Sequence, residues 1–227
     1  MLKGLEDLGF EQPTPIQAQA IPYLLESDGD LIALAQTGTG KTATFSLPIL
    51  NQIDTDEKTV QAIILTPTRE LCLQICRDIE SFSKYMPKVS TLAVYGGTGI
   101  REQIRALDKG IQIVVGTPGR TLDLIERRKL KLGNVSYLVL DEADEMLSMG
   151  FQDSLNAILD TTPDEKQTVL FSATMPKEIR KIAKKYMSDP HEISVIDKNK
   201  STANVSHEYY MTQERHRYKV LWRSCVI

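Results

Sequence analysis

The 227-residue sequence predicts an α/β domain with a mostly parallel β-sheet flanked by helices on both faces. Two observations lead to this class: short apolar runs recur along the chain, and segments with helical spacing separate them. Strands that alternate with helices are joined by right-handed crossovers, which make neighbouring strands parallel. The composition agrees, because 41% hydrophobic residues can build one sizeable domain but fall short for two.

The expected strands are apolar runs bounded by turn residues. They cover residues 30–35, 60–66, 91–95, 111–116, 136–140, 168–171 and 192–195. Helical spacing predicts helices over residues 69–82, 100–109, 120–128, 151–159 and 176–187, and another that begins near Thr42. In sheets of this kind ligands bind at the carboxyl ends of the strands, so the residues after each run are candidate site residues.

Charge and cysteine content exclude several classes of protein. Lys and Arg number 27 and Asp and Glu number 30, which gives a net charge of −3, so a nucleic-acid partner would need a local basic patch. Cys72 and Cys76 lie in a helical pattern without companions for a metal site, so we expect buried thiols and a reducing, cytoplasmic location. No signal sequence or apolar run of about 18 residues is present, so we expect no membrane partner.

The strongest chemical motif is AQTGTGKT at residues 35–42, between an expected strand and an expected helix. It predicts a P-loop, in which glycine dihedrals let successive backbone N–H groups point at phosphate oxygens. Lys41 would reach the β- and γ-phosphates and the Thr42 hydroxyl would ligate Mg²⁺. The predicted nucleotide-binding residues of this loop are Ala35, Gln36, Thr37, Gly38, Thr39, Gly40, Lys41 and Thr42.

A second motif, DEAD at residues 141–144, follows the strand expected at residues 136–140. Asp141 would hold Mg²⁺ through water, and Glu142 would orient or deprotonate the attacking water. Lys41, Asp141 and Glu142 are therefore the predicted catalytic residues, with Thr42 and Asp141 at the metal. The alternative is an acidic cap on a nearby helix, which the helix dipole favours.

These motifs together resemble the first, RecA-like domain of a DEAD-box RNA helicase over about residues 1–195. The amino acids in these motifs are most similar to those of bacterial helicases of the cold-shock or ribosome-assembly type. The resemblance implies an RNA-stimulated ATPase that uses ATP and Mg²⁺ and drives local unwinding of RNA. Two other classes stay open: a P-loop translocase acting on DNA, and a non-enzymatic RNA-binding scaffold.

The resemblance extends to GFEQPTPIQ at residues 9–17, which is similar to the family's Q motif. It implies that Phe10 stacks on adenine, that the Gln17 amide bonds the same base, and that Gln12 adds a backbone contact. The alternative makes Phe10 a core residue and Gln17 a surface residue of a helix. The family has another aromatic residue further upstream, which lies before the start of this chain.

Three more motifs at strand ends resemble those that line the family's groove for single-stranded RNA. Hydroxyls, backbone amides and arginines would hold the RNA backbone there without reading its sequence. The alternative is that the threonines cap helices and the glycines make turns. The predicted RNA-binding residues are Pro67, Thr68, Arg69, Gly96, Gly97, Thr117, Pro118, Gly119 and Arg120.

Ser172 and Thr174 belong to a segment similar to the family's SAT motif, which implies that they couple ATP to RNA through Asp144. The alternative is a helix N-cap before Pro176. The basic segment 177–185 that follows is expected to be a solvated helix face.

The expected organisation has three parts. Residues 1–195 form the ATP-binding RecA-like domain, 196–206 an interdomain linker, and 207–227 the start of a truncated second RecA-like domain. The resemblance implies that the second domain of the full-length chain supplies arginines for hydrolysis, which are worth roughly 10³ to 10⁵ in turnover. We therefore expect this fragment to be weakly active or inactive alone.

Overall fold

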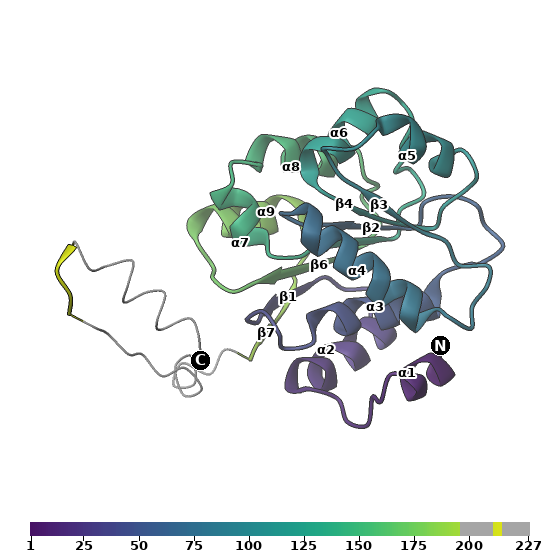
Figure 1. Ribbon diagram of the computed structural model, residues 1–227. Coiled ribbons are helices and arrows are strands. Elements are labelled where there is room, and N and C mark those ends of the chain that lie inside the picture. Colours follow the sequence, from purple (N-terminus) through teal and green to yellow (C-terminus); the bar gives the residue numbers. More distant parts are fainter. Residues whose placement is uncertain (196–210, 215–227) are drawn as a thin grey trace. The chain divides into compact units, whose positions relative to one another are not determined.

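The computed structural model describes residues 1–195 and 211–214 (Figure 1). Residues 1–195 belong to one compact unit. The expected linker at 196–206 lies outside the described residues, as does most of the segment expected to begin a second domain. Among the described residues, no helix is both long and apolar enough to cross a membrane.

Seven parallel strands form a single sheet in the order β3-β4-β2-β5-β6-β1-β7. The arrangement confirms the predicted fold class, and each expected strand is found with its ends shifted by at most two residues. The strands are β1 (Leu31–Leu34), β2 (Ala62–Leu65), β3 (Thr91–Val94), β4 (Ile113–Gly116), β5 (Tyr137–Leu140), β6 (Gln167–Ser172) and β7 (His191–Ser194).

The helices match the expected ranges less evenly. Helix α6 begins at Pro118, two residues before the expected start, because proline suits the first helical position. No ranges were predicted for α1, α2 and α7. The helices are α1 (Leu2–Asp7), α2 (Pro15–Glu26), α3 (Lys41–Gln52), α4 (Arg69–Phe82), α5 (Ile100–Leu107), α6 (Pro118–Glu126), α7 (Ala143–Ser148), α8 (Gln152–Leu159) and α9 (Lys177–Tyr186).

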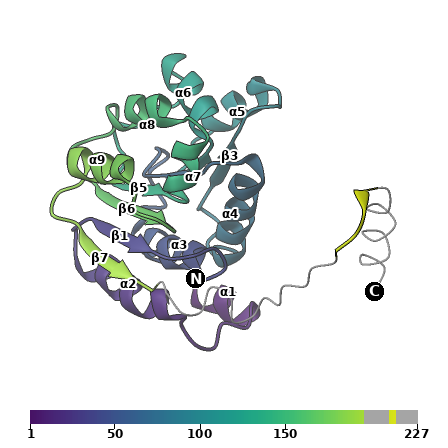
Figure 2. The ribbon, with the colours of Figure 1, turned by 90° about the vertical axis from the view of Figure 1, so that its left-hand side faces the viewer.

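The helices cover the sheet in two layers, seen from a second direction in Figure 2. Helices α2, α3 and α4 pack on one face, and α6, α7, α8 and α9 pack on the other. Side chains alternate along each strand, so Leu31 and Ala33 of β1 join the first core while Ile32 joins the second. Burial on both faces explains why the strands read as continuous apolar runs.

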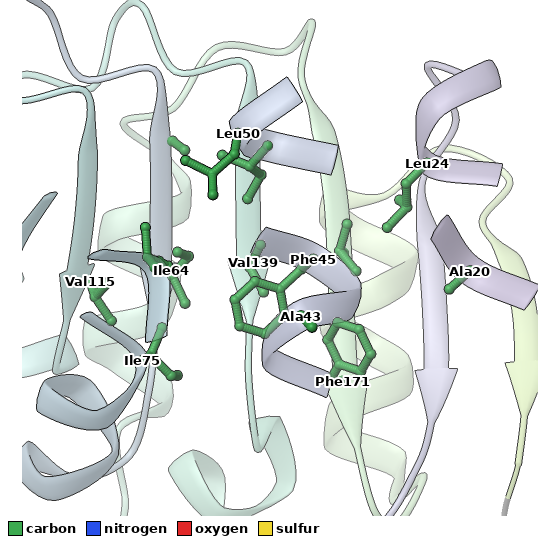
Figure 3. Packing of buried hydrophobic residues seen from close by; sticks show 14 of the residues in the cluster. Ala20, Leu24, Ala43, Phe45, Leu50, Ile64, Ile75, Val115, Val139 and Phe171 are labelled. Atoms are coloured by element: carbon green, nitrogen blue, oxygen red, sulfur yellow. The ribbon is translucent and has the colours of Figure 1, made fainter. Parts of the chain in front are cut away.

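The first core is centred on two aromatic rings (Figure 3). Phe45 of α3 and Phe171 of β6 lie with ring centres 5.6 Å apart, and both are almost fully buried. Ile64 and Val139 continue the packing along the sheet. This core fixes the start of α3 against the ends of β1 and β6, where the candidate site lies.

Candidate functional site

The loop between β1 and α3 has the backbone that a phosphate-binding turn requires. Gly38 and Gly40 have φ of +80° and +90°, a left-handed region that favours glycine. A Cβ on Gly40 would also lie 2.5 Å from Gln17 Nε2. Ala35, at the first position of the motif, is buried and donates its N–H to the Ser172 carbonyl at 3.0 Å. This position continues the β1–β6 ladder, so alanine fits where the general pattern has glycine.

Helix α2 holds this loop through two side chains. Thr14 Oγ1 donates to the Thr39 carbonyl at 2.8 Å, and Gln17 Nε2 donates to the Gly40 carbonyl at 3.2 Å. Gln17 Oε1 accepts from the Thr14 N–H at 2.9 Å, which completes a capping box. Gln17 is only 5% exposed, so the alternative of a surface glutamine is wrong. Both ends of its amide bond to backbone, and the structure therefore shows it as a brace of the P-loop.

A pocket of about 390 Å³ lies beside this loop. Phe10 stands at its edge, 43% exposed, with its ring edge-on to Phe82 at 5.8 Å between centres, so it is not the core residue of the alternative interpretation. The predicted residues that line the pocket are Phe10, Gln17, Thr37, Gly38, Gly40, Lys41, Thr42, Asp141 and Glu142. Ala35, Gln36, Thr39 and Gln12 do not line it.

Helix α4 supplies further lining residues that the sequence analysis missed. Gln74, Asp78 and Ser81 face the pocket from this helix, opposite the P-loop. They lie between one and about three and a half helical turns beyond Arg69, the last residue of the motif, so only their helical spacing could have indicated them. Burial raises the pKa of the Asp78 carboxyl, which shows that this wall of the pocket is partly shielded from water.

The acidic motif meets Lys41 at the base of the pocket. Lys41 Nζ lies 3.3 Å from Asp141 Oδ1 and 3.8 Å from Glu142 Oε1. Burial raises the pKa of the Asp141 carboxyl and Lys41 opposes the rise; burial likewise raises the pKa of Glu142. Glu142 has φ +53° and ψ +50°, a strained conformation for a residue with a side chain. Such strain concentrates at functional sites, and the Glu142 carboxylate remains partly exposed beside Lys41.

These donors fit Mg²⁺. Magnesium keeps several waters and takes one or two protein carboxylates together with phosphate oxygens. Lys41 is the only described partner of the fully buried Asp141 Oδ1, and Thr42 lines the same pocket. Within residues 1–195 and 211–214, no cluster of three or more His, Cys, Asp or Glu side chains could hold a metal by itself. The donor set therefore suits an ion that arrives with a phosphate ligand.

Asp144 joins the acidic motif to the end of β6. Its Oδ2 accepts hydrogen bonds from Thr174 Oγ1 at 2.7 Å and from the Thr174 N–H at 2.9 Å. Although burial raises the pKa of Asp144, hydrogen bonds from Thr174 and Ser172 hold that pKa below its usual value. Pro176 itself occupies the N-cap of α9, so the alternative of a Ser or Thr cap before Pro176 is wrong.

The three motifs predicted to bind RNA lie together, because β3, β4 and β2 are neighbours and parallel. Thr68 also caps α4 by accepting the Leu71 N–H at 3.2 Å, whereas Thr117 makes no side-chain cap. Pro67 and Pro118 are buried, and the exposed members of the group are Arg69, Gly96, Gly97 and Gly119.

Arg120 is held by residues that the sequence analysis did not single out. Its guanidinium donates to Gln103 Oε1 and to the Thr98 carbonyl, both at 3.1 Å. Gln103 lies on α5, six residues after the Gly96-Gly97 pair. A polar residue at an apolar-facing position of a strongly amphipathic helix was the available signal.

The two remaining groups have structural roles. Cys72 and Cys76 are free, buried thiols packed in the first core, as predicted. The lysines and arginine of α9 are exposed while Ile179 and Ile182 face the second core. This confirms the expected solvated basic face.

Comparison with known proteins relates this site to a family. The sequence model of the DEAD/DEAH box helicases matches residues 14–182. The DEAD-box ATP-dependent RNA helicase CshA of Bacillus cereus is 48% identical over 223 residues, 98% of this chain and 42% of the relative. The ATP-dependent RNA helicase DeaD of Mycobacterium tuberculosis is 48% identical over 209 residues, 92% of this chain and 37% of the relative. The chain thus spans about two fifths of the length of these relatives.

Solved structures agree with these sequence matches. A DEAD box protein from the hyperthermophile Methanococcus jannaschii has a TM-score of 0.79 and 43% identity, covering 100% of this chain and 60% of that chain. A hypothetical ATP-dependent RNA helicase from Sulfolobus tokodaii has a TM-score of 0.77 and 38% identity, covering 85% of this chain and 56% of that chain. These matches confirm the RecA-like fold class. Taken with the family match over most of its length, they show that the chain belongs to the DEAD/DEAH box helicase family.

Proposed function

We propose that this chain is the ATP-binding half of an RNA helicase core, which hydrolyses ATP to drive local unwinding of RNA when joined to a second RecA-like domain. The observation that carries the proposal is the pocket in which Lys41, Thr42, Asp141 and Glu142 meet beside a left-handed glycine loop. Phosphoryl transfer requires mainly positioning and neutralisation of charge, and this group supplies both.

Each residue of the pocket has a role in this proposal. The backbone amides of residues 37–42 and the Lys41 ammonium bind the phosphates. Thr42 and Asp141 hold Mg²⁺, which neutralises phosphate charge when bound. Glu142 orients the attacking water. Phe10 offers an exposed ring to the adenine, and this aromatic contact supports a preference for a base that stacks.

The RNA partner is supported by the second group of strand ends. Arg69, Gly96, Gly97 and Gly119 are exposed beside Arg120 at the carboxyl ends of β2, β3 and β4. Amides and arginines suit a phosphate backbone of any sequence. The relatives are named as RNA helicases, which favours RNA over the DNA alternative. The free thiols Cys72 and Cys76 support a reducing, cytoplasmic location.

Calorimetric titration with nucleotide tests the first half of the proposal. We expect Mg·ADP and Mg·ATP to bind the chain, and Lys41→Met to abolish most of that binding because it removes the cation at the phosphates. Lys58→Met is the matched control, since Lys58 is an exposed lysine that lies outside this pocket. Equal loss in both variants, or failure of any nucleotide to bind the wild-type chain, would refute the proposed ATP site.

A further inference from the structure

Gln103 is a buried polar residue at the candidate RNA-binding edge of the sheet. Its side chain is 7% exposed. Nε2 donates to the Tyr95 carbonyl at 3.1 Å and to Thr98 Oγ1 at 3.2 Å, and Oε1 accepts from Arg120 Nη1 at 3.1 Å. The amide therefore uses its donor and acceptor sides on different motifs. It connects the turn after β3 with the start of α6.

The second nitrogen of Arg120 bonds to the same turn. Arg120 Nη2 donates to the Thr98 carbonyl at 3.1 Å, so two nitrogens of the planar guanidinium are fixed. Both acceptors are neutral, and no carboxylate pairs with Arg120 among the residues that the structure describes. The arginine thus keeps its full positive charge while its orientation is set.

The Gln103 amide also bonds to the residue that contacts Arg69, the second arginine of this group. The Arg69 guanidinium lies 4.8 Å above the Tyr95 ring, and Gln103 holds the carbonyl of that tyrosine. Gly97, in the turn between them, has φ +79° and is exposed. The buried Gln103 side chain therefore bonds to the turn at residues 95–98, which both Arg69 and Arg120 contact.

We propose that Gln103 is a positioning residue for RNA binding, which acts by orienting Arg120 against the turn at residues 95–98. The inference rests on the proposed RNA-binding function and names a residue that sets its geometry. The role requires an amide, because one group must donate to a carbonyl and accept from a guanidinium at the same time. Glutamate can accept from Arg120 but cannot donate to the Tyr95 carbonyl, and leucine can do neither.

The test measures affinity for a single-stranded, fluorescently labelled RNA by anisotropy, using the chain with Gln103→Leu, Arg120→Met and both together. We expect Gln103→Leu to weaken RNA binding about fivefold or more in the wild-type background, and less than about twofold where Arg120 is already replaced. Affinity for ADP should not change. Gln103→Glu, a smaller perturbation, should also weaken RNA binding because it neutralises the Arg120 charge.

Gln112 provides a matched control. It is also buried, at 3% exposed, and its amide makes three hydrogen bonds, to Ser90, Glu57 and Lys88. It immediately precedes β4, at the end of that strand opposite to Arg120. We expect Gln112→Leu to lower thermal stability as Gln103→Leu does but to leave RNA affinity unchanged. If both variants weaken RNA binding equally, or if the loss from Gln103→Leu persists undiminished without Arg120, the positioning role is overturned.

A measurement without RNA separates this inference from the proposed function. In the wild-type chain, NMR of the Arg120 guanidinium, assigned with Arg120→Lys, should show restricted rotation that Gln103→Leu releases. If rotation of the Arg120 guanidinium is restricted in a wild-type chain that binds no RNA, the proposed RNA-binding function is refuted, but the orienting role of Gln103 is retained. Free rotation in the wild-type chain overturns the orienting role whatever the RNA affinity.

Discussion

Replacement of Gln17 separates two roles for one side chain. The sequence resemblance assigns the Gln17 amide to adenine, whereas the structure bonds its Oε1 to the Thr14 N–H and its Nε2 to the Gly40 carbonyl. Gln17→Ala removes both bonds, each worth about 0.5–1.5 kcal/mol net, which gives an upper range of about 1–3 kcal/mol. The Gly40 carbonyl still accepts from Thr44 Oγ1 at 3.0 Å, so it is not left unpaired. We therefore expect a loss of about 1–2 kcal/mol in the free energy of unfolding.

The assay combines urea unfolding with calorimetric titration of ADP and GDP. Because the brace acts on the P-loop, Gln17→Ala should weaken binding of both nucleotides by similar factors. Gln12→Ala is the control, since Gln12 is an exposed glutamine of the same motif whose side chain makes no hydrogen bond in the described structure. Unchanged stability in Gln17→Ala, together with a loss of affinity for ADP alone, would show that the amide recognises the base and would refute the bracing role.

Three further variants test other parts of the structure. Phe45→Ala should cost about 3–5 kcal/mol of unfolding free energy in urea titrations, because it empties a fully buried site against Phe171; a loss below about 1 kcal/mol would contradict the packing. Glu142→Gln should keep ADP affinity within about threefold and abolish residual ATP turnover, since it removes the carboxylate proposed to orient the attacking water; retained turnover would exclude that role. Thr174→Val should destabilise the chain at pH 7. A carboxyl whose pKa is lower in the folded state stabilises that state at pH values above its unfolded pKa. The difference in Tm between the wild-type chain and Thr174→Val should therefore shrink as the pH falls below 3.8 and Asp144 is protonated. A difference in Tm that does not depend on pH would contradict the Asp144 contact.

The sequence predicted the sheet well because its strands are buried on both faces. Continuous apolar runs such as residues 111–116 have few other structural uses, and each was found as a parallel strand. Helix α2 was not assigned a range, although Thr14 before Pro15 is a helix-start pattern. Its apolar residues are spaced around two prolines, which obscured the helical period.

The part of the site that follows the ends of the strands was predicted, because the order of the strands determines where those residues lie. Asp141 and Glu142 directly follow β5, and Lys41 begins the helix that follows β1 and its loop, so their meeting at one end of the strands follows from a parallel sheet. Gln103 and Asp78 reach their places from the middle and end of helices. Helical spacing shows which face of α4 and α5 these residues occupy, but not what they contact, because their partners are distant in the sequence and depend on how the two helices pack. The bonds of Gln17 to the P-loop likewise required the packing of α2 beside α3.

The bracing of the P-loop by α2 has a consequence for the length of the segment before it. Thr14 and Gln17 fix the start of α2 to the loop, and the Phe10 N–H is bonded to the Leu5 carbonyl at 3.1 Å. The spacer of residues 11–13 must therefore span a set distance. One inserted residue would shift Phe10 along the rim while everything after Thr14 kept its place. The number of residues in this spacer, and not only their identity, determines whether the Phe10 ring stands at the edge of the pocket beside the P-loop.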